Sequence, residues 1–589
     1  MASLAIPCVK YCYLVIIVKK LLKFFKGYVK ETILGPLFKL FEASLELIVP
    51  LIIASIIDIG IPNGDIGYIA RMCGVLVLLG LVGLGFSLTA QYFAAKASVG
   101  FVTQVKRGLY KHLQTLSYAD MDSLGTSTMI TRMTADSSKL QTGLNLTLRL
   151  LLRSPFVVFG AMIMAFSIDR KSGLNFLAVI LTLSVVVFGI MLITMPMYKR
   201  VQSGVDRILS KTRENLSGVR VIRAFGMEDN EIAEYKNENS KLASSGIKAG
   251  NVSALTNPLT YIIINLGIIF LIHTGGLKVY SGELTQGQVI ALYNYMSQIL
   301  VELVKLANLI VSISKALASA GRISSVFEIT PSQSFGNRET GEETDVRIEF
   351  SDVSLSYNGS GEGSLEAISF SARRGETVGI IGGTGSGKTS LVNLIPRFYD
   401  ATEGKVILDG VDIRDYTREA LIKKIGIVPQ KAVLFSGSIK DNIKWGKESA
   451  NDDEIIKAIE TAQAGDVITA KGGLDAKIEA GGKNLSGGQR QRLTIARALV
   501  GNPDVLILDD SASALDYATD ASLRASLKKL DCEKTIFIVS QRASSVMHAD
   551  KIIVLDDGRA VGIGTHEYLL KNCSVYREIY DSQFKKEVS

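Results

Sequence analysis

Gly382-Gly383-Thr384-Gly385-Ser386-Gly387-Lys388-Thr389 is the most informative segment of this 589-residue sequence. It follows an apolar run, residues 378–381, and precedes a helix-like run, residues 390–394. The glycines allow consecutive backbone N–H groups to curve round a triphosphate, Lys388 supplies a cation, and Thr389 offers a hydroxyl to Mg2+. Glycine-rich turns between strands and helices also occur for structural reasons alone. The order strand, loop, Lys-Thr and helix favours a phosphate-binding loop.

A second element of this chemistry is the apolar run Val505-Leu-Ile-Leu, which ends in the carboxylates Asp509 and Asp510. A buried strand tip is a place where an Asp binds Mg2+ directly or through water, and the next acid can orient an attacking water. About twenty residues earlier the sequence reads Leu485, Ser486, Gly487, Gly488, Gln489 before an amphipathic helix. The start of that helix is suited to a second phosphate contact.

Composition indicates that the membrane-spanning segments lie in the first half of the chain. The mean hydropathy is +0.27, whereas the second half is ordinarily polar, so the apolar excess lies before it. The net charge of +8 comes from Lys and Arg that form no tracts, and we interpret it as cytoplasmic membrane-facing loops, with no nucleic-acid partner. The cysteines lack metal-ligand or disulfide spacing, which suits a reducing compartment; they are Cys8, Cys12, Cys73, Cys532 and Cys573.

Six apolar segments each approach the roughly 20 residues needed to cross a bilayer. Short turns join the first to the second, the third to the fourth and the fifth to the sixth, and long polar connections join the others, which we expect to be helices continuing far into the cytoplasm. Lys and Arg concentrate in the long connections, so these connections, both termini and the second half are predicted to be cytoplasmic. The predicted spans are residues 33–59, 72–93, 146–167, 174–195, 255–276 and 286–311.

Three shorter segments have their own predictions. Residues 19–30 alternate Lys with Leu, Phe and Tyr, which favours an interfacial helix over a solvated basic linker. Residues 118–136 and 215–228 each show a helix, a Gly-containing break and another helix, so they are candidate helix tips that press on a partner, although ordinary solvated turns have the same pattern. Residues 1–18 receive no function.

The domain organisation follows from these segments. We predict an N-terminal extension with the interfacial helix (1–32), a six-helix transmembrane domain (33–328), a linker rich in turn formers (329–345) and a nucleotide-binding domain of alternating strands and helices (346–589). The fold class is therefore an α-helical membrane domain followed by an α/β domain.

At this point the motifs resemble a known family. The second half resembles the nucleotide-binding domain of ABC transporters, and the first half resembles the six-helix membrane domain of ABC exporters. The resemblance implies the Walker A loop at Gly382 to Thr389, the signature at Leu485 to Gln489 and the Walker B acid at Asp509. It also implies ATP and Mg2+ as ligands, and a dimer in which each ATP lies between one Walker A and the other subunit's signature. Further roles implied by the resemblance are adenine stacking for Tyr357, a Mg2+ and coupling sensor for Gln430, the D-loop for Ser513 to Asp516, and a coupling segment for residues 215–228.

Two positions depart from that family pattern. Asp510 stands where the family has a catalytic glutamate, and Gln541 where it has the switch histidine. The Asp carboxylate is withdrawn by roughly an ångström, a misplacement that can cost about a hundredfold in rate, and Gln carries neither positive charge nor a relayed proton. We therefore expect this site to bind ATP but to hydrolyse it very slowly. The signature, in contrast, is intact.

We therefore expect one half of a heterodimeric exporter, in an integral bacterial plasma-membrane protein, whose partner chain carries the functional Glu and His. A slow homodimer exporting lipid or peptide, and an ATP-gated channel or regulator that moves no solute, are the alternatives.

The substrate is expected to be an amphipathic drug, with lipids and peptides also open. Polar groups in the spans can mark a substrate path; those of the first span can equally pair along their own helix. The groups are Lys39, Glu42, Glu46, Gln91, Asn265, Asn294 and Gln298.

Overall fold

The computed structural model describes residues 21–357, 363–530 and 533–584. These residues form two compact units. The membrane unit holds the described residues up to His112 together with Ser127–Ile329, and the nucleotide unit holds Leu113–Thr126 together with the described residues from Thr330 onward. The predicted division between residues 328 and 346 is therefore incomplete, because a short piece of the first half groups with the second half.

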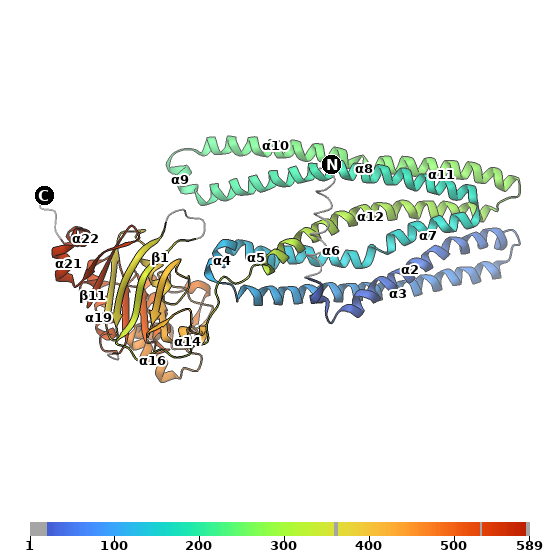
Figure 1. The fold of residues 1–589 in the computed structure, drawn as a ribbon. Coiled ribbons are helices and arrows are strands. Elements are labelled where there is room, and N and C mark those ends of the chain that lie inside the picture. Colours follow the sequence, from blue (N-terminus) through green and yellow to red (C-terminus); the bar gives the residue numbers. More distant parts are fainter. Residues whose placement is uncertain (1–20, 358–362, 531–532, 585–589) are drawn as a thin grey trace. The chain divides into compact units, whose positions relative to one another are not determined.

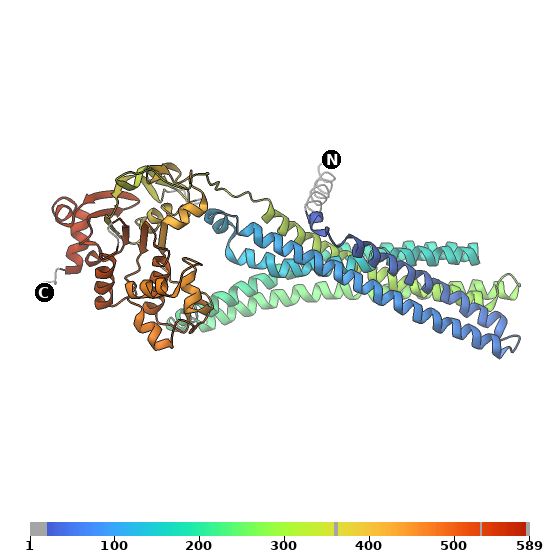
Figure 2. The same ribbon diagram turned by 90° about the horizontal axis from the view of Figure 1, so that it is seen from below.

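The membrane unit is built from long helices that run side by side (Figures 1 and 2), and all six predicted spans are found in order. α3 and α8 each have 48 residues, or about 72 Å at 1.5 Å per residue. That length exceeds the roughly 30 Å of a hydrocarbon core, so the predicted continuation of helices beyond the membrane is confirmed. The helices are α2 Val29–Ser55, α3 Ile66–Leu113, α5 Thr126–Thr131, α6 Ser137–Leu150, α7 Arg153–Ile168, α8 Arg170–Ser217, α10 Glu228–Ala254, α11 Thr256–Tyr280 and α12 Gln286–Phe327.

Both predicted helix tips are present. α4 (Tyr118–Leu124) ends at Gly125, whose φ of 72° lies in the left-handed region that favours glycine. α9 (Val219–Ala224) is followed by Gly226 with φ 61° and then by α10. Glycine adopts these φ values without the strain that a side chain would cause, so the chain can leave the helical conformation at these positions. The breaks lie where the sequence predicted them.

The single interfacial helix predicted for residues 19–30 is wrong in the described part of that range. Lys23–Phe25 form a 3-10 turn, Gly27 has φ 102°, and the chain re-enters a helix at Val29. The rings of Phe24 and Phe25 pack on those of Phe327 and Phe101, with centroid distances of 5.6 and 4.0 Å. These aromatic contacts within the membrane unit compete with a regular helix. Residues 1–18 lie outside the described residues.

The nucleotide unit contains an antiparallel sheet and a six-stranded, mainly parallel sheet, which confirms the α/β prediction (Figure 1). The antiparallel order is β2-β1-β4-β5, and the larger order is β12-β11-β3-β10-β9-β6. β3, β9 and β10 are parallel neighbours, so their carboxyl ends meet at one edge. The strands are β1 Val346–Leu355, β2 Leu365–Arg373, β3 Thr377–Gly382, β4 Glu403–Leu408, β5 Val411–Asp412, β6 Ile425–Val428, β7 Gly437–Ser438, β8 Lys477–Ile478, β9 Val505–Asp509, β10 Thr535–Val539, β11 Lys551–Asp556 and β12 Arg559–Gly564.

Helices cover the larger sheet because its strands are apolar on both faces; all five residues of β9 are buried. The helices of this unit are α13 Lys388–Leu394, α14 Arg418–Lys424, α15 Ile439–Lys444, α16 Asp452–Thr461, α17 Gly465–Lys471, α18 Gly487–Leu499, α19 Tyr517–Leu527, α20 Ala543–Val546, α21 His566–Asn572 and α22 Ser574–Phe584.

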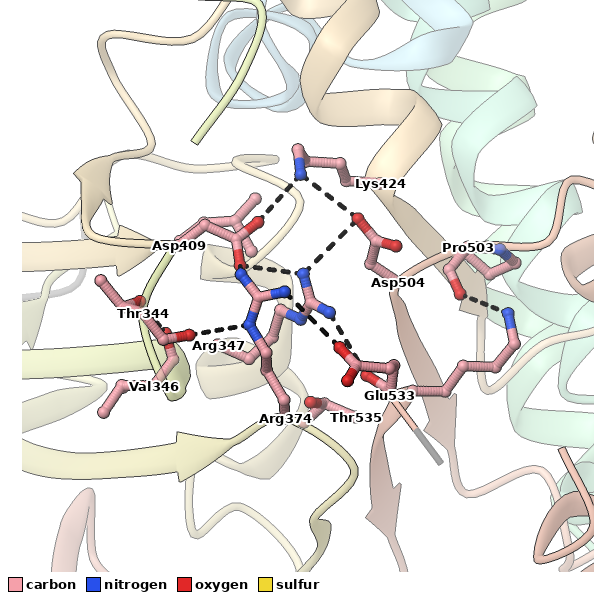
Figure 3. A network of polar contacts seen from close by, with 12 residues as sticks. Thr344, Val346, Arg347, Arg374, Asp409, Lys424, Pro503, Asp504, Glu533 and Thr535 are labelled. Carbon is pink, nitrogen blue, oxygen red and sulfur yellow. Dashed lines mark hydrogen bonds and ion pairs between the residues drawn. The ribbon is translucent and has the colours of Figure 1, made fainter. Parts of the chain in front are cut away.

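A buried ion-pair network ties the two sheets together (Figure 3). Asp409, at the end of β4, accepts from Arg347 of β1 at 2.8 Å, from Arg374 at 3.2 Å and from Lys424 of α14 at 2.9 Å. Lys424 also pairs with Asp504, directly before β9, at 3.2 Å. Asp409 and Arg347 are only 2% and 4% exposed. The network therefore fixes the antiparallel sheet to the amino-terminal ends of the parallel strands, the end opposite the phosphate loop.

Candidate functional site

The phosphate loop connects β3 to α13 in a conformation that requires glycine. Gly385 and Gly387 have φ values of 86° and 93°, which side chains rarely adopt. At Gly382 a Cβ atom would lie 2.2 Å from the carbonyl oxygen of Leu555. The sequence can therefore form this tight curve only with glycine at these positions.

A pocket of about 490 Å³ opens at this loop and gathers most of the predicted chemistry. It lies where the carboxyl ends of β3, β9 and β10 meet, the edge at which α/β sheets bind ligands. Of the predicted site residues, it is lined by Thr384, Gly385, Gly387, Lys388, Thr389, Gln430, Asp509, Asp510 and Gln541. These residues span more than 150 positions of the sequence and meet in one place.

Lys388 is the cation of this pocket. Its side chain is largely buried, and its Nζ donates to the backbone carbonyls of Gly382, at 3.0 Å, and Gly383. Burial lowers the pKa of Lys388, whereas the charges of Asp510 and Asp509 act in the opposite direction. A buried ammonium that is held by neutral carbonyls is well suited to an incoming phosphate anion, which would supply the missing negative charge.

Thr389 and Asp509 form an oxygen-donor pair that fits Mg2+. The Thr389 hydroxyl donates to Asp509 Oδ1 at 3.2 Å, and Gln430 lines the same pocket. Burial raises the pKa of Asp509, reinforced by Asp510 and opposed by Thr389 and Lys388. Mg2+ prefers hydroxyl, carboxylate and amide oxygens and usually needs only one or two carboxylates when phosphates supply the rest. The donor set present here matches that preference.

Asp510 and Gln541 line the pocket together with Lys388. Asp510 has φ 47°, a left-handed conformation that Asp tolerates better than most residues, and its N–H donates to the Val539 carbonyl at 3.0 Å. The backbone carbonyl of Gln541 accepts from Gln583 Nε2 at 2.8 Å. Hydrogen bonds thus hold the backbone at both residues. The contribution of Asp510 and Gln541 to ATP hydrolysis therefore depends on the length and charge of their side chains.

Other predicted residues lie outside this pocket. The Tyr357 hydroxyl donates to Ser390 Oγ at 3.0 Å, so this ring borders the pocket through Ser390. Ser486 caps α18 in a reciprocal capping box with Gln489, and Asp516 caps α19 through Thr519. The lining of the pocket includes none of Leu485, Ser486, Gly487, Gly488, Gln489 and Asp516.

The sequence reasoning missed one wall of the pocket. Gly363, Ser364, Val539, Asp557 and Gly558 also line it. Asp557 and Gly558 have φ values of 44° and 76° and form the tight turn between β11 and β12. An Asp-Gly dipeptide between two apolar runs predicts such a hairpin, but nothing in it predicts proximity to the phosphate loop.

Comparison with known proteins agrees with this geometry. The family described as "ABC transporter transmembrane region" matches residues 32–303, and the family described as "ABC transporter" matches residues 365–513. "Uncharacterized ABC transporter ATP-binding protein YfiB" of Bacillus subtilis (strain 168) is 34% identical over 97% of this chain and 99% of its own length. The chain belongs to the ABC transporter family. "Putative multidrug export ATP-binding/permease protein YgaD" of the same organism is 30% identical to this ABC transporter over 96% of the chain and 99% of the relative.

The fold of this ABC transporter is that of an exporter. A solved structure described as "Structure of a bacterial Atm1-family ABC exporter with ATP bound" superposes with a TM-score of 0.79, covering 95% of this chain and 99% of that one at 22% identity. The chain is thus an integral multi-pass membrane protein with an ATP-binding domain of the ABC ATPase class, which lies in the cytoplasm in such transporters. ABC exporters work as dimers within the lipid bilayer.

Three of the predicted polar groups, Lys39, Glu42 and Glu46, form ion pairs in the membrane unit of this ABC transporter, whereas Gln91 and Asn265 are exposed. Lys39 pairs with Glu42 along α2 at 2.5 Å, which confirms the pairing alternative for these two residues. Glu46, in contrast, crosses to Arg153 of α7 at 2.6 Å, and Arg153 also pairs with Glu302 of α12 at 2.5 Å. Glu302 was not among the polar groups predicted from the sequence, although one Glu in an apolar span is itself a signal.

Proposed function

We propose that this chain is one half of an ATP-driven exporter of amphipathic or hydrophobic solutes, that its own site binds Mg2+ and ATP with little hydrolysis, and that it pairs with a second, different half-transporter chain. The observation that carries the proposal is that Asp510 and Gln541 line the same pocket as Lys388 and Thr389. The pocket is lined by residues suited to hold a triphosphate, whereas the two side chains proposed to complete hydrolysis are shortened or uncharged.

The signature segment supports the second part of the proposal. Ser486 and Gln489 build a regular helix start with N–H groups suited to a phosphate, and this start does not contribute to the pocket of its own chain. It is therefore free to close an ATP held by a partner. In the proposed cycle ATP draws two nucleotide domains together, the long helices carry that closure to the membrane spans, and hydrolysis at the site closed by this signature resets the dimer.

The relative named as a multidrug export protein supports an amphipathic drug as substrate. ATP-dependent dye accumulation in inside-out vesicles that contain this chain together with any chain that copurifies with it measures that activity directly. Accumulation that requires ATP supports export, and absence of flux for a broad dye panel favours the regulator.

The degenerate site is tested with the double variant Asp510→Glu/Gln541→His in the full chain reconstituted in lipid. We expect ATP turnover at this site to rise by about tenfold to a hundredfold, because a carboxylate misplaced by about an ångström costs that much. Adding Lys388→Ala to the double variant is the matched control, and it should abolish the gain. Unchanged turnover in the double variant would contradict the assignment of Asp510 and Gln541.

Partner identity is tested by purifying the tagged chain from its own host and measuring the intact masses that accompany it. A second chain with its own nucleotide-binding domain supports the heterodimer, whereas recovery of this chain alone supports a homodimer with two weakened sites.

A further inference from the structure

Helix α22 is the last helix that the structure describes (Figure 1). It has a fixed place on the nucleotide unit, because Tyr576 is fully buried in an apolar cluster. Ile381 of β3, directly before the phosphate loop, belongs to the same cluster, and so do Ala543 and Val546 of α20. The cluster therefore joins this helix to the two elements that border the nucleotide pocket on either side.

Gln583 lies seven residues after Tyr576, so both side chains lie on the same face of α22. The Gln583 side chain is exposed, but its amide bridges two backbone groups of the segment that follows β10. Nε2 donates to the Gln541 carbonyl at 2.8 Å, and Oε1 accepts from the Ala543 N–H at 2.8 Å. Since one partner accepts and the other donates, the two bonds together fix the orientation of the amide.

Helix α19 holds the same segment from another side. Arg524 of α19 donates to the Ser544 carbonyl at 2.7 Å, and Asp520 pairs with Arg524 at 2.9 Å. This contact lies beyond Gln541 in the sequence, whereas Gln583 acts on Gln541 itself. The position of the Gln541 backbone therefore depends on the C-terminal helix.

Gln541 lines the nucleotide pocket together with Asp510 and Lys388. Its side-chain amide has two N–H donors, which suit a phosphate oxygen. Asp510 is the carboxylate expected to orient the water that attacks the terminal phosphate, so the Gln541 amide beside it is placed for that same phosphate. ADP lacks the terminal phosphate, and a contact to it therefore distinguishes ATP from ADP.

We infer that Gln583 is a positioning residue, which holds the Gln541 backbone so that the Gln541 amide reaches the terminal phosphate and the site retains ATP in preference to ADP. The inference rests on the proposed function, in which this site binds ATP with little hydrolysis. Such a site needs interactions specific to unhydrolysed ATP, and a neutral amide held in place supplies one. The C-terminal helix thereby takes part in the selection of the nucleotide.

A purely structural role for Gln583 depends on a different atom of the same amide. Ala543 is the first residue of α20, and the first N–H groups of a helix have no partner within it. Gln583 Oε1 caps that N–H, whereas the positioning of Gln541 needs Nε2. Gln583→Glu keeps an oxygen for the Ala543 N–H and removes the donor to the Gln541 carbonyl, so this variant separates the two roles.

The test is the binding of radiolabelled ATP and ADP to the full chain reconstituted in lipid, together with any chain that copurifies with it. Binding is measured with Mg2+ on ice, to limit hydrolysis, and the component that Lys388→Ala removes belongs to this site. In Gln583→Glu we expect the Kd for ATP to rise about tenfold, the order of one lost hydrogen bond to a charged group. The Kd for ADP should not change.

Two further variants serve as references. Gln583→Met removes both ends of the amide and should raise the Kd for ATP at least as much as Gln583→Glu does. Ser582→Ala is the matched control, because it removes a hydroxyl that donates within α22, to the Ile579 carbonyl. This control should bind both nucleotides as the unmodified chain does.

A double-mutant cycle tests whether Gln583 acts through Gln541. Gln541→Ala removes the amide itself and should also raise the Kd for ATP about tenfold. Adding Gln583→Glu to Gln541→Ala should raise it no further, because both changes remove the same interaction. Unchanged ATP binding in Gln541→Ala would leave no contact to position and would overturn the inference.

The remaining outcomes separate the inference from the proposed function. An equal loss of ATP and ADP binding in Gln583→Glu, or effects that multiply in the double variant, would show that Gln583 supports the fold of the site and does not position Gln541. Unchanged ATP binding in Gln583→Glu would show that Gln583 only caps α20, which also overturns its role. If Lys388→Ala removes no ATP binding, the proposed ATP site itself is refuted.

Discussion

Replacing Arg153 is expected to destabilise the membrane unit more than any surface charge does. Arg153 is 7% exposed and bridges Glu302, 3% exposed, and Glu46. Arg153→Met leaves the Glu302 carboxylate buried, with Ser154, at 2.7 Å, and Lys305, at 2.9 Å, as its remaining partners among the described residues. Breaking a buried pair typically costs about 3–5 kcal/mol. Because Lys305 remains, we expect the lower end, about 3 kcal/mol.

The assay is the thermal midpoint of the purified full chain in one detergent. For units of this size about 3 kcal/mol corresponds to a fall in Tm of roughly 6–12 °C. Arg207→Met is the matched control, since Arg207 pairs with Glu238 at 3.4 Å on the surface and exposed pairs contribute little; its Tm should not change measurably. The double variant Arg153→Met/Glu302→Met should recover most of the loss, because replacing both partners by apolar side chains is often neutral.

Two results would refute this reasoning. A Tm for Arg153→Met equal to that of Arg207→Met would mean that the cluster is hydrated and not buried. A double variant less stable than Arg153→Met alone would mean that the Glu302 carboxylate still stabilises the unit without Arg153 and is not an uncompensated buried charge.

Two further predictions concern the nucleotide unit. Asp409→Ala leaves Arg347 and Arg374 without their shared carboxylate, and we expect a loss of about 3–5 kcal/mol in the free energy of unfolding of this unit, measured by urea titration; a loss below about 1 kcal/mol would contradict the assigned role of the network. Asp509 has a pKa raised first by burial and then by Asp510. Such a group binds its proton more tightly in the folded state, so its contribution to stability falls as the pH rises through the folded-state pKa. Asp509→Asn should therefore raise the Tm of the nucleotide-free chain at pH 7 more than at pH 4, and an increase independent of pH would contradict this reasoning.

The membrane topology was predictable because it depends on local composition. Each span is a continuous apolar run, and the glycines at positions 125 and 226 break helices through their own φ values. The phosphate loop was equally predictable, since its glycine spacing and Lys388 lie within one segment of eight residues. In all these cases the determining interaction lies within the segment itself.

Contacts between distant segments were not predictable. Glu46 meets Arg153, and Tyr399 meets Asp122, across more than 100 residues. A helix pattern gives the face on which a side chain lies but not the neighbour it meets. The failure at residues 19–30 has the same origin, because Phe24 and Phe25 pack on rings far along the chain, and a pattern of alternating Lys and Phe contains no information about them.

The grouping of Leu113–Thr126 with the nucleotide unit has a practical consequence for anyone who isolates the ATPase part of this transporter. A fragment beginning at Thr330 is contiguous in sequence but incomplete as a folded body. Without α4 it would uncover Phe398 and Tyr399 and leave Ser332 without its hydroxyl contact. Such a fragment would be prone to self-association through the exposed rings of Phe398 and Tyr399. A synthetic peptide of residues 113–126 should bind to these rings and restore the solubility of the fragment.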